Sequence, residues 1–179
     1  RRVGSVAVLV CDGADCQDTS SLIAARSLAG VLHAAGVLRD SMLRALSSSD
    51  LDASFAPKAA AAAHLRDTTG AATLLEAICL FSSVSSTFGN VGQANYAAAN
   101  AYLDAVASSC RLGGILGSSL QIPAVSGAGM GARSFATEQL DAMGAISLDA
   151  FASCLELTLA PARAAAASTQ APLASQVLQ

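Results

Sequence analysis

The amino-acid sequence predicts an α/β fold built on a doubly wound parallel sheet, and three observations support this prediction. The valine-rich residues 3–10 run into a turn at Asp12 and Gly13, as a buried strand would. Residues 77–81 are five apolar residues in a row, which is typical of a strand covered on both faces. Helix-forming segments separate the apolar runs, and strands that alternate with helices form right-handed βαβ units.

The hydrophobic pattern predicts the other elements in order along the chain. Strands are expected at residues 3–10, 31–36, 77–81 and 118–122, and helices at residues 18–29, 47–65, 93–112, 134–143 and 147–159. Pro57 should kink or interrupt the second of these helices, because proline has no backbone N–H. Residues 164–179 carry no charge and fit either a linker or a trailing helix and strand. We therefore assign residues 1–160 to one domain and residues 161–179 to a tail or linker.

The composition argues against several classes of partner. Only 13% of the 179 residues are charged and the net charge is -3, so no basic surface for nucleic acid is expected. The apolar stretches are much shorter than the roughly 20 residues of a membrane-spanning helix, so no membrane partner is expected. The five cysteines are scattered and match neither a zinc knuckle nor a Cys-x-x-Cys motif, which indicates a cytoplasmic protein without a metal site.

A phenol, an amide and a hydroxyl are expected to converge at one edge of the sheet. Tyr96 and Asn100 lie four residues apart on the strongest predicted helix, so they share one helix face. Ser82 and Ser83 follow an apolar strand, and doubly wound sheets bind ligands where their strands end. Each residue alone has a plainer interpretation, because a helical tyrosine usually packs in the core and a helical asparagine is usually solvated.

Together with their neighbours, these residues form a more specific pattern. Residues 31–37, 55–58, 80–86 and 92–104 resemble the ketoreductase domains of modular type I polyketide synthases, which belong to the short-chain dehydrogenase/reductase superfamily. The resemblance extends over most of residues 1–160, and it implies a Rossmann-like fold with NADPH as the cofactor. It also implies reduction of a 3-ketoacyl thioester on the phosphopantetheine arm of an acyl carrier protein, in polyketide or fatty acid synthesis. Residues 1–160 would then be the C-terminal part of a catalytic domain that works beside other synthase domains.

The resemblance implies catalytic roles for four residues. The family's serine stands thirteen residues before its tyrosine, which selects Ser83 with Tyr96. These synthase domains exchange the usual lysine and asparagine positions, so the resemblance assigns the lysine to Lys58 and the asparagine to Asn100. Tyr96 would protonate the developing alkoxide, Ser83 would hydrogen-bond that oxygen, and Lys58 would lower the pKa of the phenol and bind the nicotinamide ribose. Asn100 would anchor the helix or a water chain. Without the family pattern, Lys58 would be interpreted as a solvated surface lysine.

Cofactor contacts are implied for a second group of residues. By resemblance, Asp12 would approach the adenine, and Ala34, Ala35 and Gly36 would line the cofactor after the next strand. Asp12 is equally consistent with a turn former, because Asp-Gly pairs end strands for backbone reasons alone.

Two further residues bear on the configuration of the alcohol. Family members that produce the D-alcohol carry a Leu-Asp-Asp motif, and this chain has Leu38, Arg39 and Asp40 at that place. Phe88 stands where the opposite class commonly has tryptophan. The resemblance therefore implies the D-alcohol type, with Asp40 and Phe88 as the candidate residues for stereocontrol.

The sequence also departs from the family pattern. No glycine-rich phosphate turn precedes residue 3, so we expect an N-terminally truncated domain that lacks the first strand and that turn. Residues 122–125 stand where the family usually has a segment containing tryptophan. One alternative is therefore a non-catalytic structural half that cannot bind NADPH alone. Another is a stand-alone dehydrogenase for a different alcohol or ketone, although Asn100 in place of lysine argues against it.

Overall fold

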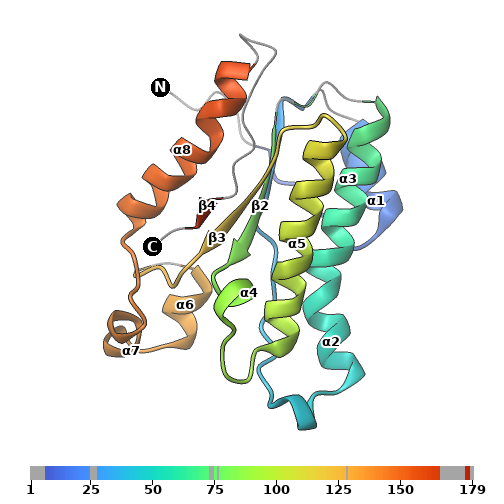
Figure 1. Cartoon of the computed structure of the whole chain (residues 1–179). Coiled ribbons are helices and arrows are strands. Elements are labelled where there is room, and N and C mark those ends of the chain that lie inside the picture. The colour runs from blue at the N-terminus through green and yellow to red at the C-terminus, as the bar shows by residue number, and fades with distance from the viewer. Residues whose placement is uncertain are drawn as a thin grey trace.

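A parallel sheet lies at the centre of the computed structural model, which describes residues 7–24, 28–72, 75, 77–127, 129–165 and 176–177. The described strands lie side by side in chain order: β1 (Gly30–His33), β2 (Ala77–Ser83), β3 (Gly117–Ile122) and β4 (Gln176–Val177). Helices cover both faces of this sheet (Figure 1). The predicted α/β fold with a parallel sheet is therefore confirmed.

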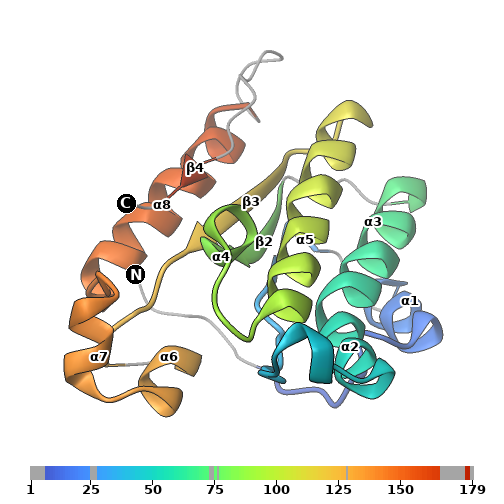
Figure 2. The same cartoon turned by 60° about the horizontal axis from the view of Figure 1, so that its bottom comes forward.

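The helices are distributed unequally between the two faces (Figure 1, Figure 2). One face carries a group of four: α1 (Cys16–Ala24), α2 (Ser48–Phe55), α3 (Ala61–Ala72) and α5 (Ala94–Leu112). The other face is covered by α8 (Leu148–Ala165). Shorter helical segments lie toward the end of the molecule to which β2 points: a 3-10 turn (Leu43–Ala45), α4 (Ser85–Phe88), α6 (Gly129–Ser134) and α7 (Thr137–Ala142).

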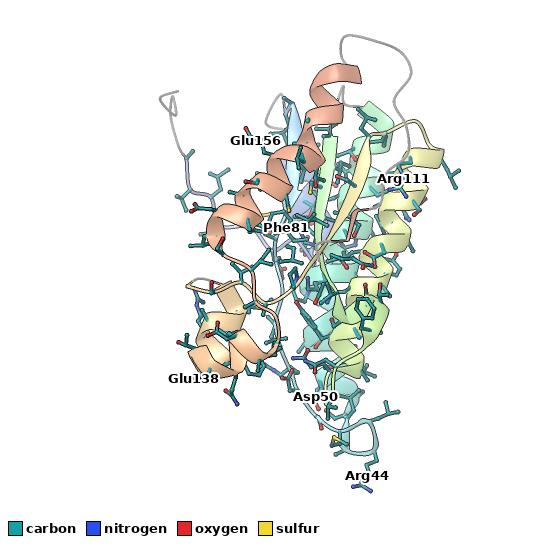
Figure 3. All side chains as sticks on the ribbon, turned by 60° about the vertical axis from the view of Figure 1, so that its left-hand side comes forward. Arg44, Asp50, Phe81, Arg111, Glu138 and Glu156 are labelled. Atoms are coloured by element: carbon teal, nitrogen blue, oxygen red, sulfur yellow. The ribbon has the colours of Figure 1, made fainter. Side chains whose placement is uncertain are left out.

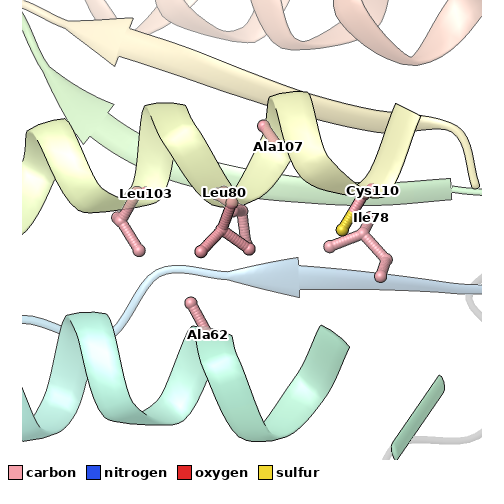
Figure 4. Packing of buried hydrophobic residues seen from close by; sticks show 7 residues of the cluster. Ala62, Ile78, Leu80, Leu103, Ala107 and Cys110 are labelled. Atoms are coloured by element: carbon pink, nitrogen blue, oxygen red, sulfur yellow. The ribbon is translucent and has the colours of Figure 1, made fainter. Parts of the chain in front are cut away.

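Two apolar clusters hold the layers together, one on each face of the sheet. Residues of β2 alternate between them, because successive side chains of a strand point to opposite faces. Between the sheet and the helices α3 and α5 lies a fully buried cluster, seen in Figure 4: Ala62, Ile78, Leu80, Leu103, Val106, Ala107 and Cys110. On the opposite face, Cys79 and Leu120 are fully buried, and side chains of α8 such as Phe151 and Leu155 pack against them while remaining partly exposed.

The long helical segment that starts at α2 shows how its sequence determines its shape. Ser47 and Asp50 form a capping box, in which the Ser47 hydroxyl accepts from the Asp50 backbone N–H and the Asp50 carboxylate accepts from the Ser47 backbone N–H. Pro57 then interrupts the α-helical pattern as predicted, and residues Ala56–Ala60 form a π-helical turn in which the Ala61 N–H reaches the Ala56 carbonyl. The segment continues as α3.

Several predicted boundaries were wrong. Residues 7–10 of the expected 3–10 strand do not form a strand, and Val8 and Val10 are exposed; a strand requires a paired neighbour, and no described strand pairs with them. The rest of that prediction lies outside the described residues. The next strand ends at His33 instead of residue 36. The helix expected at 18–29 is α1, and residues 28–29 are not helical.

The C-terminal boundaries differ from the predictions as well. The expected helix 134–143 corresponds to the shorter α7, and α6, which was not predicted, precedes it and ends at Ser134. The last predicted helix continues to Ala165 instead of ending at residue 159. The sequence of residues 164–179 fits either a linker or a helix followed by a strand. The described part of this segment contains the end of α8 and the short strand β4, and the other residues lie outside the described ranges. Among the described helices, none combines the length and the hydropathy needed to cross a bilayer.

Candidate active site

The helix α5 brings Tyr96 and Asn100 together on the face that meets the sheet. Tyr96 is 8% exposed and Asn100 is fully buried. The Asn100 side-chain amide donates to the Tyr96 carbonyl at 2.9 Å, one turn back along the helix. The Ser82 hydroxyl donates to the Asn100 carbonyl at 3.2 Å. The end of β2 is therefore bonded to the turn of α5 that carries the phenol.

Lys58 lies inside this site and not on the surface. Its side chain is 2% exposed, and its ammonium nitrogen donates to the Phe81 carbonyl of β2 at 2.9 Å. The same nitrogen lies 5.3 Å from the centre of the Tyr96 ring, a distance at which a cation is attracted to an aromatic face. Burial lowers the pKa of Lys58 to about 8, and the Asp104 carboxylate opposes this shift. The interpretation as a solvated lysine is therefore wrong.

The surroundings of the Tyr96 hydroxyl raise its pKa above the ordinary value for tyrosine. Burial is the main cause, and the negative charge of Asp40 acts in the same direction. Interactions with the side chains of Asn100 and Ser83 lower the pKa but do not outweigh burial. The phenol is consequently protonated at neutral pH and is available as a proton donor.

Ser83 is the last residue of β2 and stands in register with Ile122 of the neighbouring strand. Its hydroxyl accepts a hydrogen bond from the Ser85 backbone N–H at 3.2 Å, which turns the chain into α4. Ser83, Tyr96, Lys58 and Asn100 therefore come together at the carboxyl end of β2, as the sequence predicts. Phe81, labelled in Figure 3, has its ring on the opposite side of the strand, against Phe151 of α8.

The residues that follow β1 lie against the lysine. The His33 ring is within hydrogen-bond distance of the Lys58 carbonyl, with 3.2 Å between Nε2 and the oxygen. A Cβ atom added to Gly36 would lie 2.9 Å from Cε of Lys58 and 3.6 Å from Cε of Met130, so a side chain at position 36 would displace the lysine. Ala34 and Ala35 precede this glycine and are exposed.

Asp12 is held in a local turn. Its carboxylate accepts from the Ala14 N–H at 2.9 Å, and its own N–H donates to the Asp18 carboxylate at 3.0 Å. These contacts account for Asp12 as a turn former. Its approach to an adenine stays a prediction.

The structure treats the two candidate residues for stereocontrol differently. The carboxylate of Asp40 accepts from the side-chain amide of Gln93 at 3.0 Å, and Gln93 in turn accepts from Asn90 at 3.0 Å. This connects Asp40 to the chain just before Tyr96. Phe88, at the end of α4, is 77% exposed and makes no comparable connection to the site among the contacts of the described residues.

Sequence reasoning missed a network of polar side chains around Asp104. The carboxylate accepts hydrogen bonds from Ser86 at 2.8 Å, from the Gln121 amide at 2.9 Å, and from Ser119. The network joins α4, α5 and β3 beside the lysine. Its signal was present in the sequence, because Asp104 follows Tyr96 by eight residues and thus shares its helix face, and Ser119 and Gln121 alternate on one face of a strand.

Asn95 was missed too, although it directly precedes the tyrosine. It is fully buried, and its amide nitrogen lies between a backbone carbonyl of residue 39, one of residue 50, and the Ser54 hydroxyl. Nothing in the local sequence distinguishes this asparagine from a solvated one. Within the described ranges, no group of His, Cys, Asp and Glu side chains could hold a metal ion.

Comparison with known families and sequences gives consistent matches. The family model described as "KR domain" matches residues 2–127. The Spectinabilin polyketide synthase system protein NorA' of Streptomyces orinoci is 48% identical over 114 residues, which are 62% of this chain and 3% of that protein. Polyketide synthase GfsA of Streptomyces halstedii is 46% identical over 120 residues, 65% of this chain and 2% of that protein. The chain thus spans only a few per cent of the length of these curated relatives.

Solved structures agree with the sequence matches. The structure described as the first ketoreductase of the tylosin PKS has a TM-score of 0.73 and 33% identity, over 84% of this chain and 33% of that one. A structure of A-type ketoreductases from a modular polyketide synthase has a TM-score of 0.74 and 31% identity, over 93% of this chain and 39% of that one.

Proposed function

Because this chain belongs to the KR domain family, the ketoreductase domains of polyketide synthases, we propose that it reduces a 3-ketoacyl thioester to the 3-hydroxyacyl thioester with NADPH. The acyl chain is held by the phosphopantetheine arm of an acyl carrier protein, and other synthase domains are the neighbours. The setting is cytoplasmic polyketide or fatty acid synthesis. The observation that carries this proposal is the buried phenol of Tyr96 beneath the Lys58 ammonium, at the strand end that carries Ser83.

The residues around Lys58 fit the nicotinamide ribose of the cofactor. An ammonium has three N–H donors, and the hydrogen bond to the Phe81 carbonyl engages one of them. The glycine at position 36 lets the backbone after β1 approach the lysine. The buried Asn100 side-chain oxygen has no hydrogen-bond partner among the described residues, and an ordered water beside the cofactor would supply one. Bound NADPH would supply the hydride that goes to the ketone carbon.

The chain's own residues supply the proton and stabilise charge. Tyr96 donates its phenolic proton to the ketone oxygen as negative charge develops there. Ser83 donates a hydrogen bond to the same oxygen. The positive charge of Lys58 then stabilises the phenolate that remains on Tyr96. Asn100 holds the Tyr96 carbonyl and can anchor a water chain that returns a proton to the phenol.

The proposed product is the D-alcohol. Support comes from Asp40, which matches the last residue of the Leu-Asp-Asp motif and whose charge acts on the phenol of Tyr96. Chiral chromatography of the reduced thioester tests this assignment. A product that is only the L-alcohol contradicts it.

The decisive experiment replaces Tyr96 by phenylalanine in the full-length protein and measures ketone reduction. Loss of general acid catalysis should lower the rate by about 1,000-fold. Tyr102→Phe is the matched control, because Tyr102 lies on the same helix, is 38% exposed, and should tolerate the change. Near-normal reduction by Tyr96→Phe would overturn the proposed function.

A second candidate function is a structural half that does not bind NADPH alone, and it follows from the coverage of the comparisons. The chain spans 33% to 39% of the polyketide ketoreductase structures described above. Titration of this chain with NADPH, followed by the fluorescence of the nicotinamide, separates the two candidates. Saturable binding favours the enzyme, and no binding favours the structural half.

A further inference from the structure

The short helix α4 begins two residues after Ser83, and little within α4 itself holds it in place. It has only four residues, whereas isolated helices shorter than about 12 residues are marginal in water. Its N-cap residue, Val84, provides no side-chain hydrogen bond. Contacts with other elements must therefore fix the orientation of α4, which lies where β2 ends and beside α5 (Figure 1).

The orientation of α4 matters for the hydroxyl of Ser83. This hydroxyl accepts from the backbone N–H of Ser85, the first residue of α4, at 3.2 Å. A hydroxyl has one proton and two acceptor positions, so this bond orients the oxygen and leaves the proton for donation. A movement of α4 would displace the Ser85 N–H and thereby redirect the Ser83 proton. The direction of the Ser83 hydroxyl thus depends on what holds α4.

The carboxylate of Asp104 is the centre of the bonds that hold α4. The Ser86 hydroxyl donates to it at 2.8 Å, and the Ser119 hydroxyl donates to its other oxygen. The Gln121 amide of β3 donates both to this carboxylate and to the Ser86 hydroxyl, each at 2.9 Å. The Thr87 hydroxyl donates to the side-chain oxygen of the same glutamine at 2.9 Å. The two middle residues of α4 are therefore attached to α5 and β3.

The carboxylate can contribute in two ways, through its bonds and through its charge. Among the residues that the structure describes, no cation forms a salt bridge with Asp104. A carboxylate only accepts hydrogen bonds, which suits it to gather neutral donors from separate elements. Its charge also acts at a distance, because it opposes the lowering of the Lys58 pKa. A test must therefore separate the bonds from the charge.

We propose that Asp104 is a positioning residue that holds α4 and thereby directs the Ser83 hydroxyl toward the ketone oxygen. The inference rests on the proposed function, in which Ser83 donates a hydrogen bond to that oxygen. Asp104 follows Tyr96 on α5 by about two turns and acts through Ser86, without contact with the substrate. A misplacement of about 1 Å can change a rate by about 100-fold, so a loosened α4 should lower the rate of reduction.

The test is a double-mutant cycle on the full-length protein, with kcat for ketone reduction measured at pH 6.5. This pH is below the Lys58 pKa of about 8, so changes in the charge of the lysine contribute little. Asp104→Ala removes the acceptor of three donors and should lower kcat by about tenfold. In a Ser83→Ala background the same change should lower kcat by less than about twofold, because the hydroxyl that α4 directs is already absent. Equal losses in the two backgrounds would show that Asp104 does not act through Ser83.

Asp104→Asn separates the bonds of the carboxylate from its charge. The asparagine oxygen can accept from Ser86 and Gln121, and its NH2 group can donate to the Ser119 hydroxyl. This variant should therefore recover most of the loss and reach a kcat within about threefold of the unsubstituted protein at pH 6.5. A kcat as low as that of Asp104→Ala would show that Asp104 acts through its charge, which overturns the proposal.

Ser86→Ala tests the same connection with a smaller change, and it takes the place of Asp104→Ala if that variant does not fold. It removes the bond between α4 and Asp104, so kcat should fall by about fivefold alone and by less than about twofold together with Ser83→Ala. Ser108→Ala is the matched control, because the exposed Ser108 hydroxyl donates to the backbone carbonyl of Asp104 and not to its carboxylate. The control should keep kcat within about twofold.

A second measurement needs neither NADPH nor substrate. Hydrogen exchange of the Ser85 amide, followed by NMR on the unloaded protein, reports whether α4 keeps its bond to Ser83. The Leu103 amide, in the buried middle of α5, is the reference for global unfolding. Relative to Leu103, exchange at Ser85 should be about tenfold faster in Asp104→Ala than in Asp104→Asn. Equal acceleration of both amides would contradict a specific role of Asp104 in holding α4.

The outcomes distinguish this inference from the function on which it rests. If Tyr96→Phe abolishes reduction but the losses from Asp104→Ala and Ser83→Ala are additive, only the positioning role is overturned. Failure of the unsubstituted full-length protein to reduce ketones overturns both the proposed function and the positioning role. A loss that disappears in the Ser83→Ala background, together with faster exchange at Ser85, supports the proposal.

Discussion

The two faces of the sheet use the same strands for different purposes. On the face toward α8, β2 and β3 present Cys79, Phe81 and Leu120, and the contacts there are apolar, including the edge-to-face pair of Phe81 and Phe151 with ring centres 5.7 Å apart. On the face toward α5, the same strands present the apolar Ile78 and Leu80 and also polar groups that bond to α5. Ser82 donates to the Asn100 carbonyl, and Ser119 and Gln121 donate to the Asp104 carboxylate. One strand can therefore make only apolar contacts on one side and both apolar and polar contacts on the other.

The difference between the two faces shows where the candidate site lowers the stability of the fold. The face toward α5 has the larger fully buried apolar cluster and also encloses the Lys58 ammonium, which burial disfavours. The face toward α8 holds only partly exposed apolar side chains around two fully buried residues. We expect the face toward α5 to contribute most of the free energy of unfolding. We also expect that removal of the Lys58 ammonium from this face raises that free energy.

The largest expected effect on stability compares one leucine from each face. Leu103→Ala removes a fully buried side chain of α5 and should lower the free energy of unfolding by about 3 kcal/mol. Leu155→Ala removes a partly exposed side chain of α8 and should cost about 1 kcal/mol. Urea denaturation followed by circular dichroism measures both values. Equal losses would show that the two faces contribute alike.

The next expected effect has the opposite sign. The pKa of Lys58 falls from the ordinary 10.5 to about 8 in the folded chain, which corresponds to about 3 kcal/mol of disfavoured charge at neutral pH. Lys58→Met should remove this cost, lose the hydrogen bond to the Phe81 carbonyl, and raise the free energy of unfolding by about 2 kcal/mol net. Denaturation at pH 7 measures the change, and a less stable variant would contradict the assignment of Lys58 as a disfavoured buried charge.

The same lysine predicts how stability depends on pH. Between pH 8 and 10.5 the unfolded chain keeps the Lys58 proton and the folded chain has released it, so the unfolding free energy should rise with pH in this window. Lys58→Met should lack that part of the rise. Denaturation curves collected at pH 8 and at pH 10.5 for both proteins provide the measurement.

A smaller effect is expected on the pH dependence of catalysis. If the Lys58 charge supports Tyr96, kcat/KM for ketone reduction should decline above pH 8, as that charge is lost. Asp104→Asn removes the carboxylate that opposes the shift, so the decline should begin at lower pH. Initial rates measured from pH 6 to 10 test this. If the pH profile of kcat/KM is the same in Asp104→Asn, the Asp104 carboxylate does not influence the charge of Lys58.

The smallest expected effect concerns Phe88. Its side chain is 77% exposed, so Phe88→Ser should change the free energy of unfolding by less than about 0.5 kcal/mol. The alcohol ratio of this variant, measured beside its stability, tests the role in stereocontrol that the family resemblance implies. Unchanged stability together with a changed alcohol ratio would support that role. An unchanged alcohol ratio would show that Phe88 does not control the configuration of the alcohol.

The sequence predicts a helix or strand well where the local residue pattern is enough to determine it. The run of apolar residues in β2 and the alanine-rich α5 were predicted almost to their ends, because both patterns are local. The valine-rich residues 7–10 carry an equally clear pattern and still form no strand, since strand formation depends on a partner that the pattern does not contain.

The candidate site divides in the same manner. The convergence of Tyr96 and Asn100 with Ser82 and Ser83 could be predicted from helical spacing and from the place where a strand ends, and only the family resemblance selects Ser83. Lys58 could be identified only through the family resemblance, because it approaches from another helix. The partners of Asp104 and Asn95 lie 15 or more residues away in the sequence, and no local pattern states which polar side chain meets which.

The π-helical turn at Pro57 rotates the side chains of α3 about the helix axis relative to those of α2. A π turn holds more residues than an α-helical turn, so the helices on its two sides need not continue one apolar stripe. α2 is oriented by Ser54 against Asn95, and α3 is oriented by Ala62 in the core cluster. Lys58 lies within the π-helical turn, between these two helices. Deletion of one residue there would turn its side chain by about 100° around the helix axis. The position of the buried Lys58 ammonium therefore depends on the one residue by which the π-helical turn exceeds an α-helical turn.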